Sequence, residues 1–180
     1  NLASRRQRRR SPAAQVAVMV APKAVELAAA RDAGFDRFQL HFPAEIELSR
    51  LAEWGDLVGH DRIWLAPRRS PKTAFDLRWL EYGASILIDT YAADKFGGSG
   101  QTGNWGEFKA LESQSPDHTW VLSGGLSPEN IGNALTASGS RFLDINSGVE
   151  TAPGIKDHAK MNAAILAIHQ QRSPAGSTDV

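Results

Sequence analysis

Short apolar runs alternate along this chain with longer stretches in which apolar and polar residues are mixed. The first run, Val16 to Val20, contains no polar residue, and similar runs recur at intervals. Such runs predict strands buried on both faces of a parallel sheet, and the stretches between them have the length of a helix. The predicted strands are 16–20, 37–41, 62–66, 85–89, 119–123 and 141–146, and the predicted helices are 22–32, 46–54, 73–82, 105–112, 128–137 and 157–169.

The alternation of strand and helix predicts an α/β fold with a parallel sheet. Six strands fit either an open doubly wound sheet or most of an eight-stranded barrel, and the strand count alone does not decide between them. Polar side chains end four of the strands, at His41, Asp89, Ser123 and Asn146. Because barrel enzymes have their sites at that end of the strands, these residues favour the barrel.

Composition and charge narrow the class of protein. The 180 residues are 42% hydrophobic, which predicts one domain with its own core over 16–171, between a basic segment, 1–15, and a flexible tail, 172–180. Acidic and basic residues balance at 20 each, so the net charge points to neither nucleic acid nor membrane as a partner. No apolar run approaches the roughly 18 residues of a membrane-spanning helix. We therefore expect a soluble, cytoplasmic protein.

Two residue types bear on specific kinds of site. The sequence contains no cysteine, which excludes thiolate metal sites and a cysteine nucleophile within the residues shown, and His158 and His169 lie too far apart to predict a metal site. Five arginines cluster between positions 5 and 10. Such a run can bind nucleic acid, but no aromatic residue is interleaved with it, so we prefer a solvated helix face or a frayed terminus.

Two of the later apolar runs stop at a serine–glycine turn before a helix begins. A Ser-Gly-Gly sequence at 123–125 follows the run 119–122, and a Ser-Gly sequence at 147–148 follows the run 141–146. Unpaired backbone N–H groups in such turns, together with the N-terminus of the next helix, can hold an anion. We therefore expect two neighbouring strands to share one phosphate at these turns.

Five groups of residues, in this order along the chain, resemble the phosphoribosylanthranilate isomerase family. The resemblance runs from about residue 16 to residue 168 and rests on the groups jointly, since any one of them alone is weak. It implies a TIM (β/α)8 barrel, of which strands 3–8 lie in this chain, and an enzyme of tryptophan biosynthesis that needs no cofactor. The groups are Gln39-Leu40-His41, Leu87-Ile88-Asp89-Thr90, Gly97-Gly98-Ser99-Gly100, Leu122-Ser123-Gly124-Gly125-Leu126 with Pro128-Glu129-Asn130, and Asp144-Ile145-Asn146-Ser147-Gly148-Val149-Glu150 with Pro153-Gly154 and Lys156-Asp157-His158.

The resemblance implies an Amadori rearrangement, in which N-(5′-phosphoribosyl)anthranilate becomes 1-(2-carboxyphenylamino)-1-deoxyribulose 5-phosphate. An acid must protonate the furanose ring oxygen, which opens the ring to a Schiff base. A base then removes the proton from C2, and the resulting enolamine tautomerises to the ketone. The reaction therefore requires a protonated carboxylic acid, a base opposite it and fixed contacts to the phosphate.

Asp89 is the candidate general acid. It ends an apolar run, Ile86 to Ile88, where partial desolvation would favour the protonated carboxyl group and keep its proton available near neutrality. On the residues alone, an aspartate that caps the following loop is an equally good interpretation. The resemblance favours the catalytic role.

The resemblance also implies which residues bind the substrate and its phosphate. Backbone N–H groups after the last two strands would supply donors, and a glycine-rich loop would approach the phosphate closely because glycine permits positive φ. A lone histidine after a strand is more often structural, so His41 would have a supporting role. The implied binding residues are His41, Gly97, Gly98, Ser99, Gly100, Ser123, Gly124, Gly125, Asn146, Ser147, Gly148 and Arg6.

Neighbouring residues have structural interpretations. We expect Glu150 and Asp157 to cap the last helix, and Asp144 to be buried and hydrogen-bonded. Asn146 stands where the family usually has serine and leaves a side-chain amide near the phosphate. Phe42 replaces the usual glycine after the histidine and is expected to narrow the pocket.

The chain departs from the family pattern at its start. The family's first strand ends in Lys-Ile-Cys-Gly, whose cysteine is the general base, and its second strand leads to a Ser-x-Arg segment that contacts the anthranilate carboxylate. Ser4-Arg5-Arg6 has that form, but too few residues follow it for the second helix, so the arginines could equally belong to that helix. We expect a cysteine base upstream of Asn1. A gene that begins late or a degenerate paralogue would also account for this departure.

Two other functions stay open. A related sugar-phosphate isomerase with a long substrate would need two phosphate sites, whereas the sequence indicates one. A catalytically inactive phosphate-binding or assembly protein on the same barrel would lack the base. The expected partner is a small-molecule phosphorylated sugar, the expected oligomeric state is a monomer or homodimer, and a fusion to another tryptophan-pathway enzyme is left open.

Overall fold

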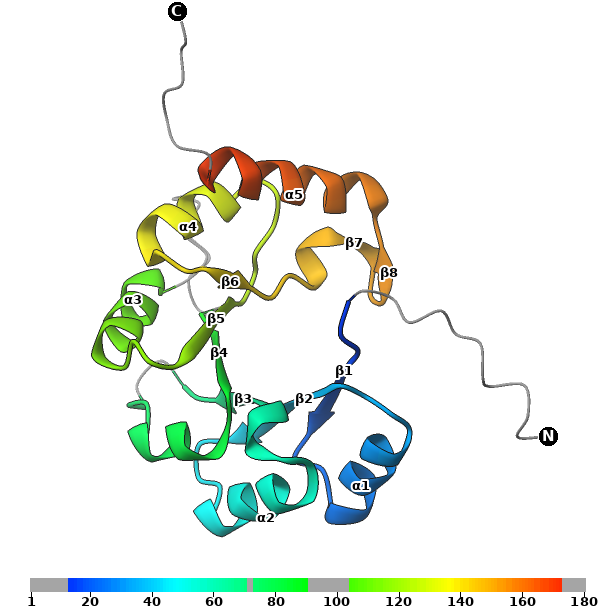
Figure 1. Cartoon of the computed structure of the whole chain (residues 1–180). Helices are drawn as coiled ribbons and strands as arrows, with labels where there is room; N and C mark the ends of the chain where they lie inside the picture. The colour runs from blue at the N-terminus through cyan, green and yellow to red at the C-terminus, as the bar shows by residue number, and fades with distance from the viewer. Residues whose placement is uncertain (1–12, 71–72, 91–103, 173–180) are drawn as a thin grey trace, which may run out of the picture. The chain divides into compact units, whose positions relative to one another are not determined.

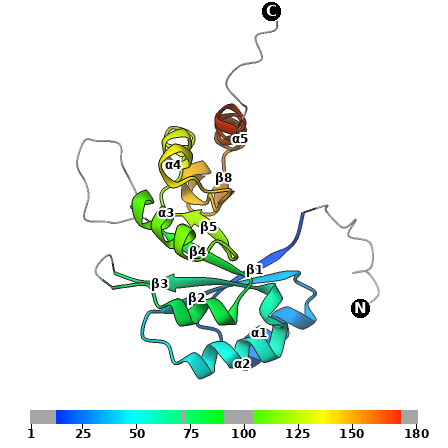
Figure 2. The ribbon, with the colours of Figure 1, turned by 60° about the vertical axis from the view of Figure 1, so that its left-hand side comes forward.

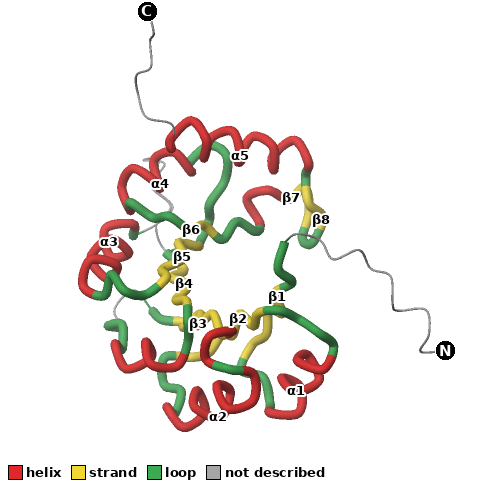
Figure 3. The backbone as a smooth tube through the Cα atoms, in the orientation of Figure 1, coloured by secondary structure: helices red, strands yellow, loops and turns green. Residues whose placement is uncertain are grey.

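The protein is described here from a computed structural model, which covers residues 13–70, 73–90 and 104–172 (Figure 1). The chain divides into two compact units. The N-terminal unit comprises Asn1–Arg69 and Phe75–Ala84, and the C-terminal unit comprises Ser70–Ala74 and Ser85–Val180. In each unit strands alternate with helices (Figure 3).

The N-terminal unit is built on three parallel strands in the order β1-β2-β3. Val18 pairs with Gln39, and Leu40 pairs with Leu65. Helices α1 and α2 lie on the same face of these strands (Figure 2). The elements are β1 (Val16–Val20), α1 (Ala24–Asp32), β2 (Arg37–Pro43), α2 (Leu48–Val58), the 3₁₀ helix η2 (His60–Arg62), β3 (Ile63–Arg68) and the 3₁₀ helix η3 (Leu77–Tyr82).

Phe42 lies in the core of the N-terminal unit. Its side chain is fully buried, and its ring lies 6.2 Å from that of Trp54 and 5.5 Å from that of Trp79, measured between centroids. Successive side chains of a strand point to opposite faces, so Phe42 lies on the face opposite its neighbour His41. The expectation that Phe42 narrows the pocket is therefore wrong.

The predicted helix 73–82 is a shorter 3₁₀ helix, η3. Asp76 caps it, because its Oδ1 atom accepts a hydrogen bond from the Arg78 N–H at 3.0 Å. Phe75 and Trp79 are spaced as on an α-helix, and their rings meet edge to face at 5.2 Å. The i, i+4 spacing of these two aromatic residues predicted an α-helix, but their contact also forms when residues 77–82 are a 3₁₀ helix.

The C-terminal unit also contains three parallel strands, in the order β4-β5-β6. Three successive residues of β4, Ile86 to Ile88, are at most 2% exposed, as expected for a strand covered on both faces. The elements are β4 (Ser85–Asp89), α3 (Trp105–Gln114), β5 (Thr119–Ser123), α4 (Ile131–Ser138), β6 (Phe142–Leu143), the 3₁₀ helix η4 (Ser147–Val149), β7 (Glu150–Ala152), β8 (Ile155–Lys156) and α5 (His158–Arg172).

Two features of the C-terminal unit differ from the sequence prediction. The predicted strand 141–146 is reduced to Phe142–Leu143, although the Asp144 N–H still donates to the Leu122 carbonyl oxygen at 2.9 Å. The antiparallel hairpin β7–β8, in which Glu150 pairs with Lys156, was not predicted. Its strands are too short to give a periodic pattern.

Two helices in this unit begin directly after a residue whose side chain caps the helix N-terminus. Asn104 precedes α3, and its Oδ1 atom accepts from the Glu107 N–H at 3.2 Å. Asp157 precedes α5, and its Oδ1 atom accepts from the backbone N–H groups of Ala159 and Lys160 at 2.8 and 3.1 Å. The predicted capping role of Asp157 is confirmed. Within the described ranges, no helix has the length and apolar character needed to cross a membrane.

Candidate active site

The carboxyl ends of β4, β5 and β6 lie side by side in the C-terminal unit. Asp89, the last residue of β4, pairs in register with Ser123, the last residue of β5. Leu122 pairs with Leu143, which puts Ser123 beside Asp144. The Ser123 hydroxyl donates to Asp144 Oδ2 at 3.2 Å. Asp89, Ser123 and Asp144 are thus neighbours at one edge of this unit.

Asp89 ends β4 in a different environment from the residues before it. The preceding three residues are buried, whereas Asp89 is exposed. The described residues therefore do not supply the desolvation that the sequence predicts for this carboxyl group. Thr90 fixes the backbone just beyond it, because its N–H and its hydroxyl both donate to the Ser123 carbonyl oxygen, at 3.0 and 2.9 Å.

The turn after β5 is shaped by two glycines and held by one asparagine. Gly124 and Gly125 have φ of +99° and +62°, a conformation that favours glycine. The buried Asn130 side chain spans the turn: its Nδ2 donates to the Gly125 carbonyl oxygen at 2.8 Å, and its Oδ1 accepts from the Ser127 N–H at 2.9 Å. The chain then enters α4 at Ile131. The turn is therefore fixed by residues within a single short segment.

The second glycine turn lies directly against the first. A Cβ atom built on Gly148 would lie 1.9 Å from the Leu126 carbonyl oxygen and 3.0 Å from Ser127 Cα. Only a glycine at position 148 allows this approach, because both contacts are with backbone atoms that cannot move independently. The prediction that the two turns follow neighbouring strands is confirmed. Their backbones together form what we call the double turn, residues 123–127 and 146–149.

The β7–β8 hairpin buttresses the second turn through Lys156. The Lys156 ammonium group donates to the Asn146 carbonyl oxygen at 2.9 Å and to Glu150 Oε1 at 2.8 Å. This hydrogen bond from Lys156 is the main reason that the pKa of Glu150 lies below its ordinary value. Glu150 was expected to cap α5, and this expectation is wrong: its carboxylate pairs with Lys156 instead.

Asp144 is half-buried rather than buried, and it is hydrogen-bonded to Ser123 as expected. Lys156 received no role from the sequence, although it lies within one of the motifs. Its contact with Asn146 depends on the hairpin register, for which the only local signal is the glycine at position 154, with φ of +79°.

His41 belongs to the N-terminal unit. It lies near the end of β2, half-buried, and its Nε2 atom is 3.1 Å from the Nε2 atom of Gln39, whose side chain is buried. Both residues point to the same face of the strand, because they are two positions apart. The remaining predicted site residues lie outside the described ranges: Arg6, Gly97, Gly98, Ser99 and Gly100.

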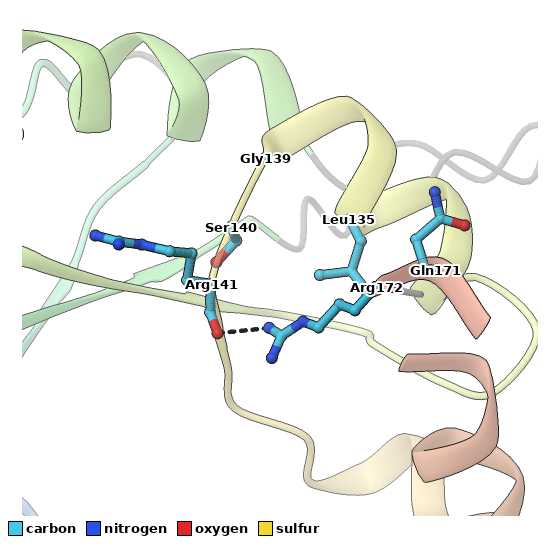
Figure 4. Close-up of a pocket in the computed structure, with 6 residues that line it drawn as sticks. All are labelled: Leu135, Gly139, Ser140, Arg141, Gln171 and Arg172. Atoms are coloured by element: carbon cyan, nitrogen blue, oxygen red, sulfur yellow. Dashed lines mark hydrogen bonds between the residues drawn. The ribbon is translucent and has the colours of Figure 1, made fainter. Parts of the chain in front are cut away.

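A separate hollow of about 450 Å³ lies between the C-terminal ends of α4 and α5 (Figure 4). Arg172 closes one side by donating to the Arg141 carbonyl oxygen at 2.5 Å, and the Arg141 side chain points away from it. Ser140 and Arg141 directly precede β6, whereas Asp144 and Asn146 follow it. The hollow is therefore at the opposite end of β6 from the double turn, and is not the candidate active site.

The chemistry available at the double turn is anion binding beside a carboxylate. The positive φ of Gly124 and Gly125 shapes the first turn, and the Lys156 ammonium group contacts the second turn at Asn146. In the part of the chain that the structure describes, no group of three or more histidine, aspartate and glutamate residues could hold a metal ion. Parallel strands that alternate with helices, with glycine turns and a carboxylate at the strand ends, are typical of the class of barrel enzymes that bind sugar phosphates.

Comparisons with known proteins identify the family. The sequence model of N-(5'phosphoribosyl)anthranilate (PRA) isomerase matches residues 3–167. The chain is 36% identical over 134 residues to the N-(5'-phosphoribosyl)anthranilate isomerase of Aquifex aeolicus, which covers 74% of this chain and 61% of that protein. It is 34% identical over 155 residues to the enzyme of Synechococcus elongatus, covering 83% and 67%. The chain belongs to the N-(5'-phosphoribosyl)anthranilate isomerase family.

Solved structures agree on the fold. The structure of TrpF from Jonesia denitrificans matches with a TM-score of 0.68 at 28% identity, over 88% of this chain and 72% of that one. Phosphoribosyl anthranilate isomerase from Thermotoga maritima matches with a TM-score of 0.69 at 25% identity, over 89% and 75%. These neighbours are TIM barrels, so the predicted fold class is confirmed. The chain spans about three fifths of the length of the Aquifex aeolicus relative.

Proposed function

We propose that this protein isomerises N-(5′-phosphoribosyl)anthranilate to 1-(2-carboxyphenylamino)-1-deoxyribulose 5-phosphate in tryptophan biosynthesis. The observation that carries the proposal is the close approach of Gly148 to Leu126, which brings the two glycine turns together. Asp89 is paired with Ser123, the first residue of this double turn. Membership of the family supports the substrate and the reaction. The activity is a proposal for the whole protein, because the chain spans only part of its relatives.

The phosphate of the substrate is assigned to the double turn. Backbone N–H groups of Gly124, Gly125, Ser147 and Gly148 would donate to it, as would the amide of Asn146. Ser123 would lie at the edge of this group, where its hydroxyl already bonds to Asp144. From the resemblance alone we add His41, the loop 97–100 and, for the anthranilate carboxylate, Arg6.

Asp89 is assigned the acid step. Its protonated carboxyl group would transfer a proton to the furanose ring oxygen, and the C–O bond would break to give the Schiff base. Removal of the C2 proton then gives the enolamine, which tautomerises to the ketone. The resemblance implies a cysteine for this second proton transfer, and the printed sequence contains none. We therefore assign no base.

The decisive assay is the loss of anthranilate-type fluorescence from freshly generated phosphoribosylanthranilate. Asp89→Asn is expected to lower kcat by at least 100-fold, because general acid catalysis contributes about 10² to 10⁴ in rate. Asp117→Asn is the matched control: it removes the same charge from an exposed position before β5 and is expected to have no effect. Near-normal turnover in Asp89→Asn would refute the acid assignment.

The assay also separates the alternative function. A protein with no turnover whose melting temperature still rises with inorganic phosphate would be a phosphate-binding or assembly protein without isomerase activity. The oligomeric state, monomer or homodimer, remains a prediction, which sedimentation of the purified protein would test. One solved structure from Thermotoga maritima is of monomers generated from a dimeric phosphoribosylantranilate isomerase.

A further inference from the structure

The Lys156 ammonium group uses all of its hydrogen-bonding capacity on the segment that follows β6. Its Nζ atom donates to three acceptors: the Asn146 carbonyl oxygen at 2.9 Å, Asn146 Oδ1 at 2.5 Å and Glu150 Oε1 at 2.8 Å. An ammonium group has three protons and accepts no hydrogen bond. With all three acceptors in place, no donor of Lys156 remains for a bound anion. Lys156 therefore acts on its neighbours rather than on the ligand directly.

The contact with Lys156 determines which way the Asn146 amide faces. Because lysine is only a donor, the amide atom that meets it must be the oxygen. The NH₂ group then occupies the other side of the amide. Among the described residues, none accepts a hydrogen bond from Asn146 Nδ2, and the Asn146 side chain is exposed. Both amide protons are thus without an acceptor among the described residues and accessible to solvent.

The Glu150 carboxylate offsets the charge of Lys156, so Lys156 affects the double turn by orienting Asn146 rather than by its electric field. Its side chain is only 13% exposed, against 40% for Lys156, and the two groups form an ion pair. A carboxylate this close to the ammonium group cancels most of its field at the cradle. Meanwhile Glu150 holds the ammonium group in line with Asn146, since Lys156 and Glu150 are paired across the hairpin.

We infer that Lys156 is a positioning residue for phosphate binding, which holds the Asn146 amide with its NH₂ group toward the phosphate at the double turn. The inference rests on the proposed function for the identity of the phosphate ester. The contact itself is tested with inorganic phosphate, which does not depend on turnover.

The first experiment compares the phosphate affinity of two lysine variants of the full chain by calorimetric titration. Lys156→Met removes the ammonium group and retains much of the side-chain length. We expect it to weaken phosphate binding about tenfold, the value of one hydrogen bond to a charged group. Lys160→Met is the matched control, because Lys160 donates to the Glu150 carbonyl oxygen but not to Asn146. It is expected to change the affinity less than twofold.

A double-mutant cycle with Asn146→Ala separates orientation from charge. If Lys156 acts through the amide, Lys156→Met has less than a twofold effect once the amide is removed. An equal loss of affinity in both backgrounds would mean that the charge acts directly, and would overturn the inference. Unchanged phosphate affinity in Lys156→Met would also overturn it.

A spectroscopic readout covers the case in which Lys156→Met is too unstable to measure. Titration of the ¹⁵N-labelled wild-type protein with phosphate should shift the side-chain NH₂ resonance of Asn146, and no shift would overturn the inference. The isomerase assay is independent of this result: a wild-type protein that binds phosphate through Asn146 without turnover would refute the proposed function alone. Turnover without the Asn146 shift would refute only the positioning role.

Discussion

Gly148→Ala is the substitution for which the structure gives the clearest expectation. The added Cβ would lie 1.9 Å from the Leu126 carbonyl oxygen and 2.8 Å from the Leu126 carbonyl carbon. Ordinary van der Waals contact begins at 3.4 Å, so the two turns would have to separate by about 1.5 Å. Neither side can yield by rotating a side chain, because the clash is with backbone.

The separation has a cost in stability and a cost in binding. Forcing an extra methyl group into a closely packed contact typically costs about 1–3 kcal/mol. A displacement of about 1 Å in groups that position a substrate can cost about 100-fold in rate. We therefore expect Gly148→Ala to lose at least tenfold in phosphate affinity, with a moderate fall in melting temperature.

Gly132→Ala makes the same chemical change at a position with room for it. Gly132 lies in α4, where an added Cβ would meet only the Gln171 Oε1 atom, at 3.8 Å. Alanine is the better helix former, by roughly 0.5–1 kcal/mol, so this variant should be slightly more stable and bind phosphate normally. Calorimetry with phosphate and thermal unfolding measure both. If Gly148→Ala bound phosphate as tightly as Gly132→Ala, the reasoning from the contact of the two turns would be refuted.

Two further predictions concern the core and the hairpin. Phe42→Ala is expected to destabilise the protein by about 3–5 kcal/mol, because it removes a fully buried aromatic ring. The KM of the remaining folded protein should stay unchanged. A large change in KM with normal stability would mean that Phe42 contacts the substrate. Glu150 has a lowered pKa in the folded protein, so its pairing with Lys156 stabilises the fold above the unfolded pKa of about 4.3 and is lost as the pH falls through the folded value. The melting temperature of the wild-type protein should therefore exceed that of Glu150→Gln near pH 7 and converge with it in acid; a difference that is independent of pH would contradict the ion pair.

The strands were predicted from the sequence because burial on both faces leaves a strong apolar signal. The bounds of β1, β4 and β5 agree with the prediction. The apolar pattern predicted too long a strand at 141–146, because polar residues interrupt this run. The strand β6 ends at Leu143, and the carboxylate of the next residue, Asp144, accepts a hydrogen bond from Ser123. Local patterns also do not distinguish an α-helix from a 3₁₀ helix over the few residues of η3.

The candidate site was predicted in part. Serine–glycine sequences at strand ends indicated the two turns, and strand order brought them together. The roles of Glu150 and Lys156 were not predicted correctly, because they depend on the register of a hairpin with strands of three and two residues. The exposure of Asp89 was also missed: a residue that ends a buried strand is not thereby buried itself.

The Asn130 side chain has a consequence for the energetics of ligand binding. Its two hydrogen bonds, to Gly125 and from Ser127, join the first glycine turn to the start of α4. They form when the protein folds, so the turn is already ordered before any anion arrives. Little conformational entropy is then lost on association, and more of the contact energy is expressed as affinity. The first glycine turn is therefore preorganised for a ligand, and association should need no slow rearrangement of the backbone.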